Sequence, residues 1–147
     1  MKIEVKTGTI EDILNIQEQI PEFKNPHSLA EYERRFSETK AFMILIAEAD
    51  GILAGFKAGY QKEEDGSFYS WMGAVQPGYR RLGIAKLLAD EMEERAKVLG
   101  YTSIKFKTRN SHKSMLIFGI SNGFNIIGIE EREIAEENRI LLEKQLF

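Results

Sequence analysis

The hydrophobic pattern of the chain changes near residue 77, and this change limits the folds that the sequence can adopt. Residues 67–75 form a strand-like segment rich in aromatic side chains, and residues 82–99 carry apolar side chains at helical spacing. The dipeptide Pro77-Gly78 is a turn signal between them. A strand that leads through a short turn into a long amphipathic helix is typical of proteins in which helices pack on a sheet.

The rest of the chain predicts strands and helices in mixed order. Helices are expected after Thr9 and after Ser28, because both residues are good N-caps, and a further helix is expected over 111–121. Strands are expected at 3–7, 41–47, 52–60, 103–107, 124–131 and 139–146, with a hairpin turn at Asp50-Gly51. We therefore predict a single three-layer α+β (α/β) domain over residues 1–147. Its central sheet is mixed but mostly antiparallel, with about seven strands flanked by about four helices.

Composition and charge exclude several classes of protein. No apolar run reaches the ~20 residues of a membrane span, and the start MKIEVKTG does not resemble a signal peptide. The chain has no cysteine, so we expect a cytoplasmic protein without disulfides, and any thiol in its chemistry must come from a cofactor. The net charge of −3 disfavours nucleic-acid binding. We expect no membrane association and no metal site.

The segment from Val75 to Lys86 carries the strongest functional signal. A helix start exposes main-chain N–H groups with partial positive charge, and most proteins place acidic or hydroxyl side chains there. Here the segment contains Arg80, Arg81 and Lys86, and the first acid of the helix is Asp90. Small residues later in the segment leave room for a ligand near the main chain. These features predict a site for a phosphate or pyrophosphate, although neither common phosphate-loop motif is present.

The motif Arg80-x-x-Gly83-x-Ala85 resembles the [QR]-x-x-G-x-[GA] signature of the GNAT acetyltransferase superfamily. Its context also resembles that family, because it follows a strand ending in Val-x-Pro and precedes a long amphipathic helix. Further along, Gly123-Phe124 resembles the Gly-Phe pair of the family, and Asn110 resembles an Asn often found near its cofactor. The resemblance implies the GNAT fold.

The resemblance also implies a cofactor, acetyl-CoA, and a reaction, acetyl transfer to a primary amine of a small molecule or peptide. In the family, the main-chain amides of the signature loop hold the pyrophosphate, and the pantetheine arm lies along the preceding strand. A main-chain N–H at about Ala74 or Val75 would stabilise the oxyanion. The residues implied in cofactor binding are Gly73, Ala74, Val75, Arg80, Arg81, Leu82, Gly83, Ile84, Ala85, Lys86 and Asn110.

The chain departs from the family at the positions that move protons. The usual tyrosine donor is replaced by Gly119, and the strand over 67–75 has no acid to act as a base. The catalytic residues are therefore unknown from the sequence, and the candidates are Tyr69, His112 and Ser114. Glu48, Tyr60 and Glu130 lie near strand ends and are unranked alternatives for the base.

The acceptor pocket is expected to contain aromatic side chains. Tyr69 and Trp71 alternate along one strand and are predicted to share a face with Val75, and Tyr32 lies on the second predicted helix. In the family, the first two helices select the acceptor. An aromatic wall suits an apolar amine or stacks on a cationic one.

Two other functions remain open at this level. The first is a non-catalytic domain that binds acetyl-CoA or CoA as a sensor or interaction module, since the usual tyrosine is missing. The second is a nucleotide binder unrelated to CoA, although residues 75–89 contain no acid to hold a metal. A homodimer is possible if the closing strand over 139–146 pairs between subunits.

Overall fold

The structure is a computed structural model that describes residues 1–147, and it contains one seven-stranded sheet with four α-helices. The strands are β1 (Ile3–Thr7), β2 (Phe42–Ala49), β3 (Ile52–Tyr60), β4 (Ser67–Val75), β5 (Ser103–Arg109), β6 (Asn125–Glu130) and β7 (Arg139–Gln145). The helices are α1 (Ile10–Gln17), α2 (Leu29–Ser37), α3 (Ile84–Val98) and α4 (Lys113–Ser121), with short 3₁₀ turns at Pro77–Tyr79 and Ala135–Glu137.

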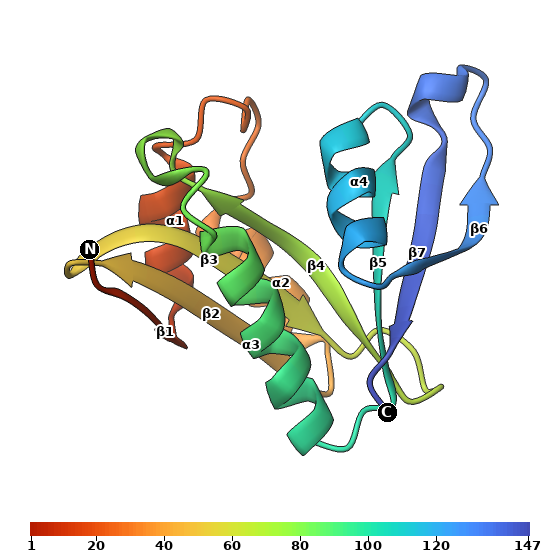
Figure 1. Cartoon of the computed structure of the whole chain (residues 1–147), viewed down its shortest axis with the longest axis horizontal. Coiled ribbons are helices and arrows are strands. Elements are labelled where there is room, and N and C mark those ends of the chain that lie inside the picture. The colour runs from red at the N-terminus through yellow and green to blue at the C-terminus, as the bar shows by residue number, and fades with distance from the viewer.

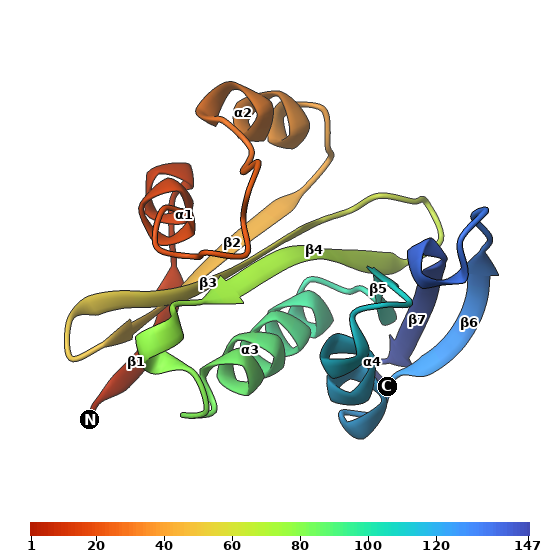
Figure 2. The same ribbon diagram turned by 90° about the horizontal axis from the view of Figure 1, so that it is seen from above.

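The sheet is mixed, and the helices cover both of its faces. The strand order is β1-β2-β3-β4-β5-β7-β6, and only β4 and β5 pair in parallel. Helices α1 and α2 lie on one face, and α3 and α4 lie on the other (Figures 1 and 2). This three-layer arrangement confirms the fold class predicted from the sequence.

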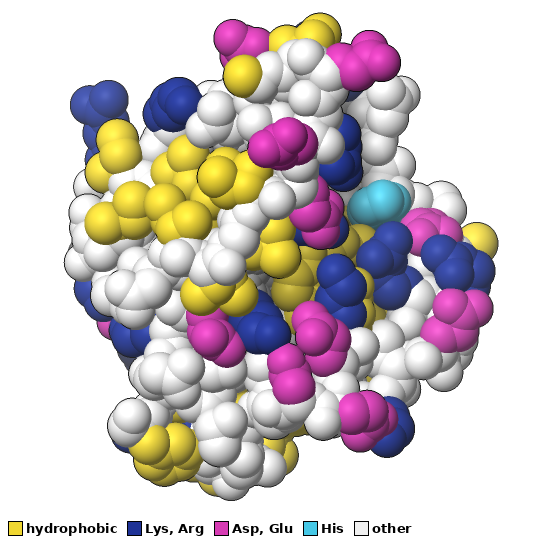
Figure 3. All heavy atoms as spheres, turned by 90° about the vertical axis from the view of Figure 1, so that its right-hand side faces the viewer, with side chains coloured by type: hydrophobic (Ala, Val, Ile, Leu, Met, Phe, Trp, Pro, Cys, Tyr) yellow, Lys and Arg dark blue, Asp and Glu magenta, His cyan; other side chains and the backbone are white.

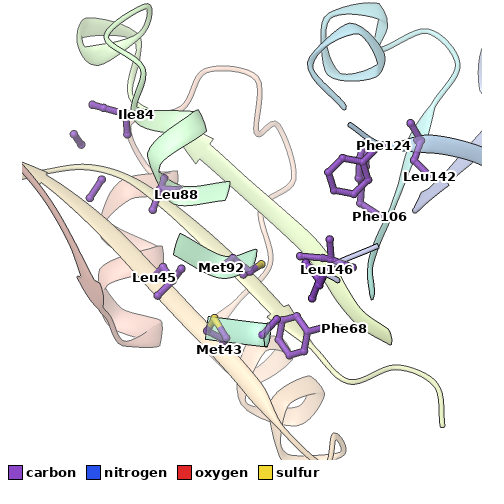
Figure 4. Packing of buried hydrophobic residues seen from close by; sticks show 14 of the residues in the cluster. Met43, Leu45, Phe68, Ile84, Leu88, Met92, Phe106, Phe124, Leu142 and Leu146 are labelled. Carbon is purple, nitrogen blue, oxygen red and sulfur yellow. The ribbon is translucent and has the colours of Figure 1, made fainter. Parts of the chain in front are cut away.

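Each face of the sheet has its own hydrophobic core. On the α3 face, Leu88 and Met92 are directed toward β2 side chains such as Leu45 (Figure 4). Phe106 and Leu142 belong to the same cluster, but they pack under α4 on the other half of the sheet. The α1 and α2 face holds a second cluster of 10 buried residues. The two cores fix β4 from both sides.

Local sequence signals explain where most elements begin and end. Thr9 caps α1 through a reciprocal pair of hydrogen bonds with Asp12, and Ser28 accepts a bond from the N–H of Glu31 at the start of α2. Asp50 and Gly51 adopt the left-handed φ angles of 49° and 82° that a tight hairpin needs. These three predictions are confirmed.

Helix α3 begins two residues later than the sequence predicts. Arg81 and Gly83 both adopt left-handed φ angles, 65° and 81°, which are incompatible with an α-helix. The helix therefore starts at Ile84, whose side chain is buried and anchors the first turn in the core.

The predicted dimer contact through the closing strand is wrong. Strand β7 pairs with β5 along one edge and with β6 along the other, so it has no free edge. The edge of the sheet is β6, which exposes Ile126, Ile127 and Ile129. No helix has the length and apolar character needed to cross a membrane.

Gly119 brings α4 close to the sheet. A Cβ atom at this position would lie 2.6 Å from Cζ of Phe106 and 3.4 Å from Leu142. Both neighbours belong to the core, so neither has free space to move into. The glycine at the usual tyrosine position is therefore required by packing.

We predict that Gly119→Ala lowers the free energy of unfolding by about 1–3 kcal/mol, because overpacking outweighs the better helix propensity of alanine. Urea denaturation measures this change. Gly128→Ala is the matched control, because no atom lies within 4 Å of its added Cβ, and it should change stability by less than about 0.5 kcal/mol. Equal stability of the two variants would contradict the packing role of Gly119.

Candidate functional site

Strands β4 and β5 form a cleft in the sheet because they pair at one end only. Residues 67–69 pair with residues 103–105, and no pairing follows, although β4 continues to Val75 and β5 to Arg109. The two strands diverge toward the start of α3 (Figure 1). Residues 73–75, which the family resemblance assigns to the pantetheine arm, lie on the part of β4 that has no neighbour on the β5 side. Strand β4 therefore separates from β5 over these residues.

A bulge in β4 reverses the alternation of its side chains. Ser70 pairs with Gly59 and Met72 with Ala58, so Trp71 is an extra residue without a partner. As a result, Tyr69, Trp71 and Met72 all pack on the α1 and α2 face, whereas Val75 packs on the α3 face. The prediction that Tyr69 and Trp71 share a face with Val75 is wrong for this reason. The bulge lies at Trp71 rather than at Gly73, which pairs with Lys57.

The loop from Arg81 to Lys86 has six consecutive main-chain N–H groups without an acceptor in the protein. The Gly83 N-cap has no side chain to accept a hydrogen bond, and the first turn of α3 contains no acid. No atom lies within 4 Å of a Cβ built on Gly83, so the space in front of the loop is open. Six convergent donors at a helix start form a site for an anion.

The cations of this loop have different partners. Arg80 donates to the carbonyl oxygen of Val75 at 2.9 Å and forms a bidentate pair with Glu22 at 2.7 and 3.0 Å. This pairing lowers the pKa of Glu22 and raises the pKa of Arg80. Lys86 pairs with Asp90 one turn further along α3. Arg81 is exposed and forms no ion pair, so it is the cation of the loop that is free to meet a phosphate.

The remaining predicted residues lie across the cleft, at the start of α4. Asn110 follows β5, and its side chain donates to the carbonyl oxygen of Ala135 and accepts a bond from Lys113. His112 is the N-cap residue of α4 but makes no capping bond, and both His112 and Ser114 are exposed. These residues therefore belong to the other half of the sheet, and Asn110 is bonded to neighbours within that half.

The aromatic residues predicted for the acceptor pocket lie together on the opposite face. Trp71 is surrounded by the rings of His27, Tyr32, Phe36 and Tyr60 at centroid distances of 5.3–5.9 Å. Tyr32 is completely buried and donates to Oε1 of Gln17 at 2.8 Å, so it supports Trp71 from behind. Seen from the β6 side, basic and acidic side chains surround a recess with hydrophobic groups on its floor (Figure 3).

The hydroxyl of Tyr69 is the candidate proton carrier nearest to the closed end of the cleft. Tyr69 pairs with Lys105 at the last paired position of β4 and β5, and its hydroxyl forms no hydrogen bond within the protein. Burial raises its pKa to about 12, so the group stays protonated at neutral pH. It can donate a hydrogen bond or hold a water molecule, but it cannot be the base, because the deprotonated form that would take up a proton is not populated at neutral pH.

The unranked alternatives for the base have other partners. Glu48 pairs with Lys6 at the β1 edge of the sheet, away from the cleft. Glu130 lies 3.6 Å from the ammonium of Lys107. The Tyr60 hydroxyl accepts a hydrogen bond from Arg35.

Lys57 is a residue of the cleft that the sequence analysis missed. It projects from β3 on the α3 face, and its Cα and Cγ lie 3.4 and 3.5 Å from the position of a Cβ on Gly73. The Lys57 ammonium has no ion pair, and burial lowers its pKa to about 8, an effect that nearby Glu93 partly opposes. The signal was a single lysine inside the apolar strand ILAGFKAGY.

We predict that Lys57→Met stabilises the protein at pH 7 by about 2–3 kcal/mol, because methionine fills the space without a charge. The folded-state pKa of Lys57 is depressed, so the unfolded chain binds one more proton between pH 8 and 10.5. Wild-type stability therefore rises relative to the variant across this window. Urea denaturation at pH 7, 8, 9 and 10 measures the difference, and a constant gap would contradict the prediction.

The cleft in the sheet and the uncapped helix start at its open end define an α+β protein of the GNAT acetyltransferase type, as the signature motif predicts. The sequence profile described as "Acetyltransferase (GNAT) family" matches residues 10–118, and the chain belongs to this family. Members of the family transfer acetyl groups.

Solved structures share this fold at low sequence identity. The ribosomal-protein-S18-alanine N-acetyltransferase of Escherichia coli superposes with a TM-score of 0.81 at 16% identity, covering 99% of this chain and 94% of its own. PaiA N-acetyltransferase of Thermoplasma acidophilum in complex with coenzyme A gives 0.73 at 19%, covering 99% of both chains. A Bacillus subtilis acetyltransferase in complex with CoA gives 0.75 at 21%, also covering 99% of both.

Proposed function

We propose that this protein is an N-acetyltransferase that binds acetyl-CoA and transfers the acetyl group to a primary amine. The observation that carries the proposal is the run of six unpartnered N–H groups over 81–86 at the open end of the β4–β5 cleft. The crystal structures of two relatives of the same fold with CoA support it. The alternative of a non-catalytic CoA-binding module shares this site and differs only in the absence of turnover.

The residues of the cleft fit the chemical groups of CoA. The amides of 81–86 and the free guanidinium of Arg81 would hold the pyrophosphate, and the unpaired edge of β4 over 73–75 would hydrogen-bond to the pantetheine amides. When bound, acetyl-CoA supplies an acetyl group activated as a thioester. Asn110 and the start of α4 would border the cofactor from the other half of the sheet.

The protein's own groups would then position the acceptor, stabilise the developing negative charge and remove the amine proton. A free N–H of β4 near Ala74 would stabilise the negative charge that develops on the acetyl oxygen. The amine would reach the cleft from the α1 and α2 face, past Trp71. It would lose a proton as its nitrogen bonds to the acetyl carbon, while the bond from that carbon to the CoA sulfur breaks and CoA leaves as its thiolate. The protonated Tyr69 hydroxyl would anchor a chain of water molecules that carries this proton along the cleft, with His112 and Ser114 as alternatives on its other side.

The proposal also includes the type of acceptor, the compartment and the oligomeric state of the protein. The acceptor is a small molecule or peptide in the cytoplasm. A homodimer would form through β6, the free edge of the sheet with three exposed isoleucines.

We predict that Ala85→Glu weakens CoA binding about tenfold or more, since two charges ~4 Å apart repel by about 1–4 kcal/mol. Ala85 is exposed in the first turn of α3, where an acid stabilises the helix, so the melting temperature should stay the same or rise. Isothermal titration with CoA and a thermal melt measure both quantities. Val98→Glu adds the same charge at the other end of α3 and should bind CoA normally. Equal affinity of the two variants would place the cofactor elsewhere.

We predict that the protein releases CoA from acetyl-CoA faster when a reactive primary amine is present. Because the chain has no cysteine, a thiol reagent reports CoA alone.

Tyr69→Phe should lower kcat about tenfold or more without changing CoA affinity, because it removes the hydroxyl that directs the proton. An unchanged kcat would remove Tyr69 from the mechanism. CoA binding without turnover of any amine in a broad screen would favour the sensor module.

A further inference from the structure

We call the α1 and α2 face of the sheet, where the predicted acceptor pocket lies, the acceptor face. Cations of the protein itself already cover the aromatic side chains on this face. Cζ of Arg35 lies 4.3 Å from the centre of the Trp71 ring, and Nζ of Lys62 lies 4.5 Å from the centre of the Tyr69 ring. A cationic acceptor would need these same ring faces in order to stack. The acceptor face therefore presents positive charge to a ligand. A cationic amine cannot stack on these rings, because the protein's own cations already occupy their faces.

Arg35 has donors that the protein leaves unused. Its guanidinium lies 3.3 Å from Oε1 of Glu31, but Arg34 contacts the same oxygen more closely, at 2.7 Å. Nε of Arg35 is the one buried side-chain nitrogen or oxygen without a hydrogen-bond partner. A buried donor of this kind is unusual in a folded protein, and it shows that Tyr60 and Glu31 do not satisfy the whole Arg35 guanidinium.

Lys62 also lacks a direct partner. It forms no ion pair or hydrogen bond, and its neighbours include the cations Lys107 and Arg35 as well as the acids Glu63 and Glu130. Partial burial is the largest influence on its pKa and lowers it, and Lys107 lowers it further. The surroundings of Lys62 therefore leave part of its positive charge uncompensated.

Arg35 and Lys62 line a common cavity of about 410 Å³ between α2 and the end of β3. Tyr60 also lines it, and its hydroxyl accepts a hydrogen bond from Nη1 of Arg35 at 3.2 Å. The three acids of the cavity wall, Glu38, Glu63 and Glu64, are each paired with a neighbouring cation, and they are outnumbered by four cations in the wall. The cavity thus offers a small excess of positive charge, which matches a single carboxylate better than a dianion such as phosphate.

We propose that the acceptor amine also carries a carboxylate, which binds between Arg35 and Lys62. This inference rests on the proposed function, because it places the amine at the open stretch of β4. Tyr69 pairs with Tyr60 and Ala74 with Phe56, so the bulge shortens five steps along β4 to the length of four along β3, about 13 Å at ~3.3 Å per residue. The acceptor is therefore an extended molecule whose carboxylate lies about this far from its amine nitrogen, with an apolar part that crosses Trp71.

The test compares a free acid with its amide at two lengths. The long pair is the tetrapeptide Ala-Ala-Ala-Phe and its C-terminal amide, because four extended residues span about 13 Å. The short pair is phenylalanine and phenylalaninamide. Each is assayed by CoA release with the wild type, with Lys62→Met and Arg35→Lys, and with Lys40→Met. Lys40 is the matched control because its charge is nearby but paired with Glu64.

We expect the wild type to favour the tetrapeptide acid over its amide by about tenfold or more in kcat/KM, equivalent to at least one charge-assisted contact. Lys62→Met should lose most of this preference while its kcat/KM for the amide stays the same, Arg35→Lys should reduce the preference, and Lys40→Met should keep it. An equal rate for acid and amide would overturn the inference and leave the proposed function standing. An acid preference confined to phenylalanine would overturn the inferred distance. No acetylation of these probes by a protein that acetylates another amine would overturn the inference alone. CoA binding without acetylation of any amine in the broad screen would overturn the proposed function and the inference with it.

Discussion

The unpaired edge of β4 is the constraint on which the rest of the structure depends. Main-chain N–H and C=O groups need partners, and a strand inside a sheet normally finds them on both sides. Here β4 pairs with β3 from Tyr69 to Val75 but pairs with β5 only up to Tyr69. The separation is maintained because α3 packs on β2, β3 and β4 while α4 packs on the other half of the sheet. An extended ligand with amide groups is the natural partner for such an edge.

Arg80 links the loop before α3 to the connection between α1 and α2, which covers the other face of the sheet. Its guanidinium binds the carbonyl oxygen of Val75 and the carboxylate of Glu22, which belongs to the connection between α1 and α2. The arginine of the signature motif therefore ties the cofactor loop to the segment that borders the acceptor face. Because this pair is largely exposed, its contribution to stability is small, and its main effect is to restrict the position of the α1–α2 connection.

The sequence predicted the fold well because the fold depends on local signals. Periodicity located the seven strands and four helices, capping residues located the starts of α1 and α2, and the signature motif located the amides of 81–86. What it could not predict were long-range effects. The extra residue at Trp71 is visible only in the pairing of β4 with β3, and the partner of Arg80 lies 58 positions away in the sequence. A lysine within an apolar strand, Lys57, was a signal that was available and not used.

The aromatic pocket shows why residue types alone do not define a ligand. Tyr69, Trp71 and their aromatic neighbours would suit a cationic ligand if their faces were open. Arg35 and Lys62 cover those faces, and these residues come from α2 and from the loop after β3. The aromatic rings then hold the two cations in place, and both cations line the cavity. The same aromatic residues can therefore support selection for a cation or for an anion, and the position of the neighbouring basic side chains decides which.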